Sequence, residues 1–147
     1  MTQLQNWLLL LYKIPPQPTA RRVYVWRKLK RLGAIVQHDA VWILPATSRT
    51  REQFQWLASE IVEMQGDASV WEAQLTAPAQ DENLIQRFIE QVDEEYRKIL
   101  ADLKRKGTDL ASLSRRFQQV QLKDYFQSEL GSQMRNALMS ARNGAAE

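Results

Sequence analysis

An almost unbroken apolar run near the start of the chain, residues 7–14 (WLLLLYKI), places the strongest constraint on the fold. Leucines occupy both alternating faces of this run. It therefore predicts a strand that is buried on both faces, or one that is central in a sheet with one covered face. Pro15, Pro16 and Pro18 are expected to end the strand, because proline has no amide hydrogen to donate to a neighbouring strand. We expect the core of this 147-residue chain to form around the strand.

A strongly basic amphipathic helix is predicted after the prolines. Thr19 is the expected N-cap, and apolar side chains at Val25, Leu29 and Leu32 recur at spacings of four and three. Gly33 stands where a C-terminal cap belongs.

A hairpin is predicted next, because two short β-branched segments at 34–36 and 40–44 flank the polar tip Gln37-His38-Asp39. A second amphipathic helix follows, and the spacing of Thr50 and Gln53 resembles a capping box at its start.

A last strand is expected over residues 70–75, so the predicted order is strand, helix, strand, strand, helix, strand. This order is typical of an α+β, ferredoxin-like βαββαβ domain with a four-stranded antiparallel sheet. We assign that domain to residues 1–78.

The remainder, residues 79–147, is predicted to be helical. An apolar seam with spacings of four and three resembles that of a coiled coil and comprises Ile85, Ile89, Val92, Tyr96, Ile99 and Leu103. Thr108 or Asp109 and then Ser128 are the expected caps of two further helices. The segment is expected to form a helical hairpin or small bundle that packs on the first domain or mediates self-association.

The composition narrows the possible chemistry. The chain has no cysteine, so disulfides, thiolate chemistry and zinc–cysteine sites are excluded. The longest apolar run is far shorter than the roughly 20 residues that a membrane helix requires. No dinucleotide-binding fingerprint is present. We therefore expect a cytoplasmic protein that is not an enzyme, with no cofactor, no metal and no membrane contact.

Positive charge is concentrated in the first third of the chain. Residues 1–48 contain seven basic side chains and one acidic, for a net charge of +6, whereas residues 80–147 contain eleven of each. The predicted basic helix supplies six candidate nucleic-acid-binding residues: Arg21, Arg22, Arg27, Lys28, Lys30 and Arg31. Tyr24 could add stacking, and Trp26 is expected in the core. The alternative is a helix whose long basic side chains only solvate its outer face.

Two further groups are weaker candidates for a site. Arg115 and Arg116 follow two serines, and guanidinium groups suit a tetrahedral oxyanion such as chromate, although these arginines could instead bridge to Asp124 or Glu95. His38 beside Asp39 is expected to form a turn rather than half of a catalytic pair.

Several longer stretches resemble a known family. They are WLLLLYKIPP, VYVWRKLKRLGA, QHDAVWILPATSRTREQFQWLASEI, DLASLSRRFQQ and DYFQSELG. Together they are similar to the N-terminal region of ChrB-type chromate resistance proteins, which are chromate-responsive transcriptional regulators of bacteria. The resemblance implies DNA as a partner and chromate as an effector. Full-length members carry a second, C-terminal domain, which would begin where this chain ends.

A more distant likeness is to the ferredoxin-like domain of PaaX-type repressors and of the Cas2 proteins of CRISPR systems. That likeness implies a homodimer that contacts nucleic acid. Cas2-type nucleases place an aspartate at the end of the first strand, whereas this strand ends in Tyr12-Lys13-Ile14, so nuclease activity is not expected. The sequence thus predicts a DNA-binding transcriptional regulator, or its DNA-binding module. The alternative is a non-DNA module that senses an oxyanion or binds a protein partner.

Overall fold

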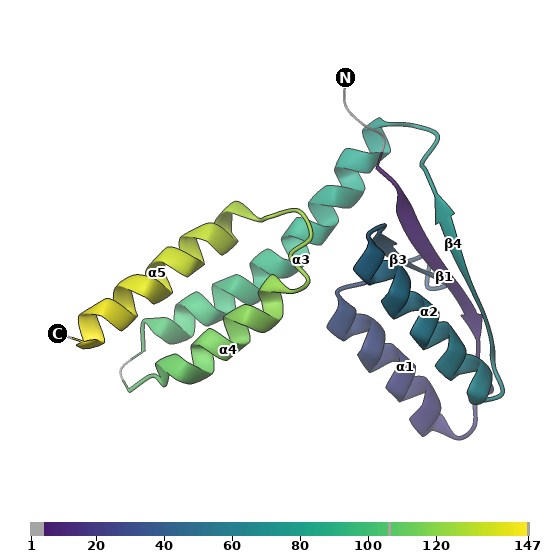
Figure 1. The fold of residues 1–147 in the computed structure, drawn as a ribbon, viewed down its shortest axis with the longest axis horizontal. Helices are drawn as coiled ribbons and strands as arrows, with labels where there is room; N and C mark the ends of the chain where they lie inside the picture. Colours follow the sequence, from purple (N-terminus) through teal and green to yellow (C-terminus); the bar gives the residue numbers. More distant parts are fainter. Residues whose placement is uncertain (1–4, 106, 147) are drawn as a thin grey trace. The chain divides into compact units, whose positions relative to one another are not determined.

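The structure is a computed structural model that describes residues 5–105 and 107–146 (Figure 1). The chain divides into two compact units, Met1–Glu82 and Asn83–Glu147. The sequence placed this boundary at residue 78. Among the described residues, no helix is long and apolar enough to cross a membrane.

The first unit is a four-stranded antiparallel sheet with two helices, as the sequence predicted. Its elements are β1 (Trp7–Lys13), α1 (Thr19–Leu32), β2 (Ile35–Gln37), β3 (Val41–Pro45), α2 (Ser48–Glu63) and β4 (Asp67–Ala73). The strand order is β2-β3-β1-β4, and every neighbouring pair is antiparallel. Each helix therefore connects two parallel strands that are separated by one other strand, which is a split βαβ arrangement.

The apolar strand β1 lies in the interior of the sheet, because it pairs with β3 on one edge and with β4 on the other. Leu8 and Leu10 are buried together with Val25 of α1 and Leu57 of α2. On the opposite face Leu11 remains 38% exposed. The sequence allowed a strand buried on both faces or a central strand in a sheet with one covered face, and β1 is the second of these.

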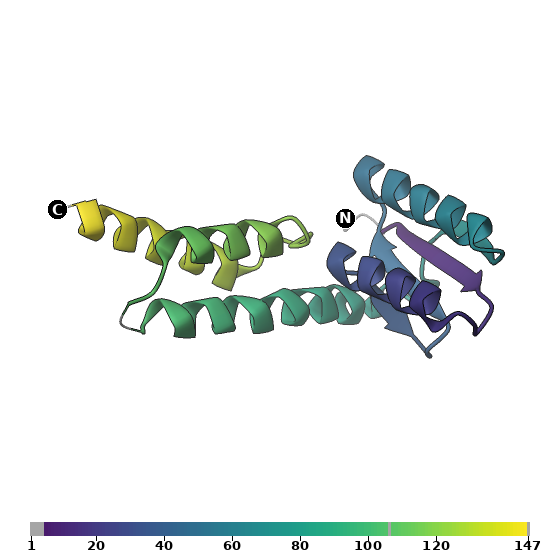
Figure 2. The ribbon, with the colours of Figure 1, turned by 90° about the horizontal axis from the view of Figure 1, so that it is seen from below.

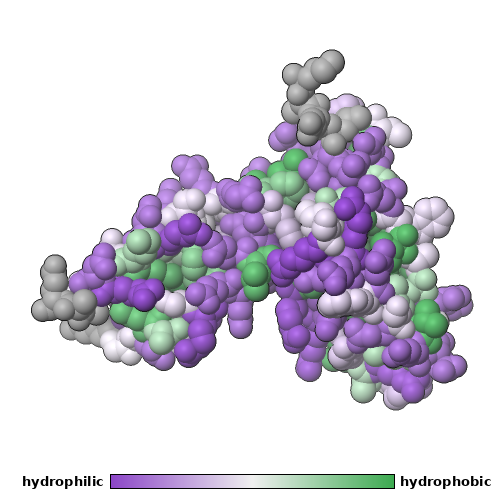
Figure 3. Space-filling view, in the orientation of Figure 1, coloured by the Kyte–Doolittle hydropathy of each residue, from purple (hydrophilic) through white to green (hydrophobic). Residues whose placement is uncertain are grey.

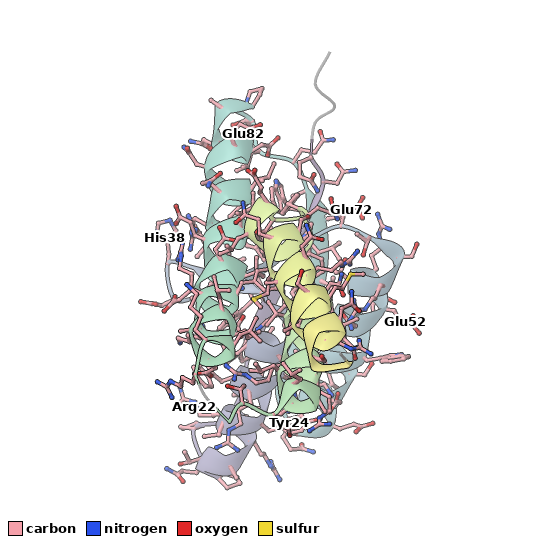
Figure 4. The ribbon with its side chains drawn as sticks, turned by 90° about the vertical axis from the view of Figure 1, so that its left-hand side faces the viewer. Arg22, Tyr24, His38, Glu52, Glu72 and Glu82 are labelled. Carbon is pink, nitrogen blue, oxygen red and sulfur yellow. The ribbon has the colours of Figure 1, made fainter. Side chains whose placement is uncertain are left out.

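The predicted hairpin is confirmed, with each strand one residue later than expected. His38 and Asp39 both have positive φ angles, of 54° and 60°, and the amide of Ala40 donates to the carbonyl of Gln37 at 3.2 Å. His38 and Asp39 are thus the central residues of a β-turn, and the pairing of Gln37 with Val41 leaves three residues between the strands. His38 is therefore a turn residue, exposed at the tip of the β2–β3 hairpin (Figure 4).

The predicted start of α2 is wrong by about one turn. The N-cap is Thr47, whose side chain accepts from the amide of Thr50, while the Thr50 side chain accepts from the amide of Thr47. Thr50 is thus the inner partner of a capping box rather than its first residue. The predicted N-cap of α1 is also wrong, because Thr19 is the first helical residue and Pro18 precedes it without a side-chain cap.

Strand β4 begins at Asp67, three residues earlier than predicted. A Cβ at Gly66 would lie 2.6 Å from the carbonyl oxygen of Lys13, so the absence of a side chain lets the chain pass close to the end of β1. Pairing of Lys13 with Asp67 then starts immediately.

The second unit is helical and consists of most of α3 (Ala79–Leu103), α4 (Leu110–Gln121) and α5 (Glu129–Ala146) (Figure 2). As expected, Asp109 caps α4 by accepting from the amide of Ala111, and Ser128 accepts from the amide of Gly131 at the start of α5. The core cluster comprises Val92, Tyr96, Ile99, Leu113, Phe117, Val120, Met134 and Leu138.

The predicted seam on α3 is correct for its second half only. Ile85 and Ile89 are half-buried, whereas Leu84 and Phe88, which the seam omitted, are buried. The ring of Phe88 contacts the rings of Tyr125 and Phe126 in the α4–α5 connection. A straight helix has 3.6 residues per turn, so a predicted seam with an average spacing of 3.5 residues drifts away from the buried face.

We predict that Thr50→Val lowers the free energy of unfolding of the first unit by about 1–3 kcal/mol. The side chain of Thr50 is fully buried and donates to the carbonyl of Pro45 at 2.7 Å, so valine would leave that oxygen and the amide of Thr47 unpaired. Urea unfolding followed by tryptophan fluorescence measures this, since all five tryptophans lie in this unit. The control is Ser48→Ala at an exposed position. A Thr50→Val midpoint equal to that of the control would contradict the prediction.

A second prediction concerns Tyr96. Burial, and then its hydrogen bond to the Asp124 carboxylate at 2.9 Å, raise the pKa of Tyr96 above its ordinary value of 10.0. An acid whose pKa is raised by folding contributes stability that is present below pH 10 and is lost as the pH rises through the folded-state pKa. The stability difference between the wild type and Tyr96→Phe should therefore shrink between pH 9 and pH 11.

Urea unfolding followed by far-ultraviolet circular dichroism measures that difference. A Tyr96→Phe difference that stays constant or grows above pH 10 would overturn the assignment.

Candidate nucleic-acid interface

The burial of one stripe of α1 decides which side chains face outward. Val25 and Leu29 are buried against the sheet, so the residues between and after them fall on the other side of the helix. Of the six predicted cations, Arg22, Arg27, Lys30 and Arg31 are exposed, and Lys28 and Arg21 are half-buried. The exposed surface of α1 is largely hydrophilic (Figure 3).

Arg21 has a structural contact that sets it apart from the other five. Its guanidinium donates to the carbonyl of Met64 at 3.0 Å, at the C-terminal end of α2, where a positive charge also complements the helix dipole. Tyr24 makes a second link between the helices, because its hydroxyl donates to the carboxylate of Glu60. That hydrogen bond raises the pKa of Tyr24. These two contacts fix α1 beside α2, and no sequence pattern predicts pairs that are 43 and 36 residues apart.

The other five cations differ from Arg21 in lacking an acidic partner in the described part of the chain. Among residues 5–105 and 107–146, none of Arg22, Arg27, Lys28, Lys30 and Arg31 forms an ion pair. Arg27 lies three and four positions from Lys30 and Arg31, and like charges at these spacings destabilise a helix by about 0.2–0.5 kcal/mol per pair. Lys30 and Arg31 occupy the last turn, where the helix dipole stabilises positive charge. Arg22 and Arg27 lie too far from that end to be stabilised in this way.

Aromatic rings flank this charge on both sides of α1. The ammonium of Lys28 lies 5.8 Å from the ring centre of Tyr24, and that of Lys30 lies 5.7 Å from the ring centre of Trp26. Trp26 is 52% exposed, so its expected place in the core is wrong. Arg22 and Tyr24 leave α1 on opposite sides (Figure 4). An open hollow of about 610 Å³ follows the helix and is lined by Thr19, Ala20, Val23, Tyr24, Arg27, Lys28 and Arg31.

The two arginines of the predicted oxyanion pair have different surroundings in the helical unit. Arg116 donates to the carboxylate of Asp102 at 2.7 Å, and Arg115 is exposed. The bridging alternative is therefore closer to the structure, although the partner is Asp102 rather than Asp124 or Glu95. Glu95 instead pairs with Lys123 at 2.7 Å.

A small cavity of about 290 Å³ lies between α3 and the start of α5, and neither Arg115 nor Arg116 lines it. The Asp124 carboxylate there accepts from the hydroxyl of Tyr96 and from the amide of Ser128 at 2.9 Å each. The hydroxyl of Ser128 donates to the carboxylate of Asp93. Two carboxylates thus accept from Tyr96 and Ser128, and the exposed Arg135 also lines the cavity. The described part of the chain contains no group of three His, Asp or Glu residues placed to hold a metal ion.

Comparison with known proteins identifies the family. The model of the family described as "Protein ChrB, N-terminal" matches residues 22–115, from the first turn of α1 to the middle of α4. Protein ChrB of Cupriavidus metallidurans is 28% identical over 97 residues, which are 66% of this chain and 29% of that protein. No solved structure matches. The chain spans less than a third of the length of that relative, and it belongs to the family of ChrB N-terminal domains.

Proposed function

We propose that the chain is the DNA-binding module of a transcriptional regulator, with α1 as its phosphate-binding surface. Membership of the ChrB family links the protein to chromate resistance. The observation that carries the proposal is the outer face of α1, on which five cations within ten residues have no acidic partner in the described part of the chain.

The dimensions of α1 suit a duplex. A helix of 14 residues is about 21 Å long, and the major groove of B-DNA, about 12 Å wide, admits an α-helix. The cations lie on several sides of the exposed surface, because Arg22, Arg27 and Arg31 are not in one row along the helix. Such a spread favours contact with phosphates on both edges of a groove rather than with one strand alone.

Chromate as effector and a homodimer as the active form belong to the same proposal. Both rest on the family and on the likeness to PaaX-type and Cas2 proteins. Arg116 already forms an ion pair with the Asp102 carboxylate, which would compete with a bound oxyanion. We therefore favour DNA binding over oxyanion sensing as the function of this chain.

Replacing Arg27, Lys28, Lys30 and Arg31 with glutamine should weaken binding to duplex DNA and flatten its salt dependence. Each phosphate contact contributes about −0.9 to the slope of log K against log salt, so loss of four contacts should reduce the slope by about 3–4. Fluorescence anisotropy with a labelled duplex of about 25 base pairs, titrated between 50 and 200 mM salt, measures this.

The matched control replaces Lys13, Arg97, Lys98 and Lys104, which are exposed and outside α1, and changes the net charge equally. Its slope should stay close to that of the wild type. Equal losses in both variants would show that total charge, not α1, determines affinity. An unchanged slope in the α1 variant would refute the proposal.

A further inference from the structure

The outer face of α5 differs in composition from an ordinary solvated helix. After Glu129 in its first turn, α5 contains no carboxylate through Ala146. The exposed residues of this face carry amide or hydroxyl groups, except for the large apolar side chain of Met139. They are Ser132, Gln133, Asn136, Met139, Ser140 and Asn143. Arg135 and Arg142 are also exposed and lie beside this face.

Helix α3 of the same unit provides the comparison. Its exposed side chains include Glu90, Glu94, Arg97 and Lys98, and Glu94 and Lys98 form an i,i+4 pair at 4.0 Å. Charges of both signs at such spacings stabilise and solvate a helix. Asparagine and serine have lower helix propensity, because their side chains compete for backbone hydrogen bonds. The asparagine and serine side chains of α5 form no hydrogen bond with any described residue, so they do not stabilise the helix through contacts within the chain.

The charges of the helical unit are also unevenly distributed. Helix α3 contains seven acidic and three basic residues, whereas residues 110–146 contain five basic and two acidic. Arg116 and Lys123 are paired with carboxylates of α3, which leaves Arg115, Arg135 and Arg142 as exposed arginines of α4 and α5. A polyanion is therefore repelled from the α3 side of the bundle and attracted to the α4–α5 side.

The outer face of α5 also matches the hydrogen-bonding edges of bases. Asparagine and glutamine form paired hydrogen bonds with adenine, serine bonds to several bases, and an apolar side chain such as Met139 can contact the methyl group of thymine. The helix is held firmly from behind, since Met134 and Leu138 are buried in the core and a Cβ at Gly131 would meet the ring of Tyr96 at 2.9 Å. A rigid support of this kind is what a base-reading surface requires.

We propose that α5 is the base-reading element of this protein and lies in the major groove of duplex DNA, with Arg135 and Arg142 on the adjacent phosphates. This rests on the proposed function, because it assumes that DNA is the partner. It deepens that proposal by assigning sequence discrimination to the helical unit, whereas α1 supplies contact that does not depend on sequence.

The test is selection from a library of random duplexes of about 25 base pairs, followed by sequencing of the bound fraction. The wild type should enrich a motif. The variant with Gln133→Ala, Asn136→Ala and Asn143→Ala keeps its net charge and gains helix propensity, so it should fold. We expect its preference for the selected motif over random duplex to fall by about 10- to 100-fold, with the salt slope unchanged.

The matched control removes three exposed polar side chains elsewhere, with Gln55→Ala, Gln80→Ala and Asn83→Ala, and should enrich the wild-type motif. An α5 variant that retains the same motif at the same strength would overturn the proposal, as would wild-type binding without any enriched motif. Absence of DNA binding by the wild type at low salt would instead refute the proposed function itself. The two failures are therefore distinguishable.

Discussion

The pairing of β1 on both of its edges is the constraint on which the first unit depends. Because β3 and β4 both bond to β1, the helices that connect the strands must cross on one face, where Leu8 and Leu10 are buried. Burial of Val25 and Leu29 on that face then sets the rotation of α1 about its axis. The cations of α1 face outward because the apolar stripe faces inward, so the candidate interface is a direct consequence of core packing.

The sequence predicted features that depend on local periodicity and turn chemistry. The order of six elements, the hairpin at His38 and Asp39, and the left-handed cap at Gly33 all follow from short patterns, and the structure contains each of them. The same holds for the exposed face of α1, because alternation of apolar and basic residues fixes that face without tertiary information.

Features that depend on long-range contacts could not be predicted. Arg21 resembles the other cations in sequence, and only the approach of the α2 C-terminus makes its role structural. Trp26 lies beside an apolar stripe but just outside the buried arc, so hydrophobicity alone placed it wrongly. An acidic partner for Arg116 was a sequence-based alternative, but its identity depends on the α3–α4 connection, which brings Asp102 beside it.

The two units differ in the kind of interaction that their surfaces offer to a polyanion. The exposed face of α1 offers charge, which acts at long range, depends on salt and does not distinguish sequences. The outer face of α5 offers fixed amides and hydroxyls, which act only on contact and distinguish base edges. The proposed DNA-binding function needs both, because steering brings a regulator to DNA and short-range hydrogen bonds make one site differ from the rest. Placing these properties on separate helices allows affinity and specificity to vary independently, since a change of charge on α1 leaves the hydrogen-bonding pattern of α5 intact.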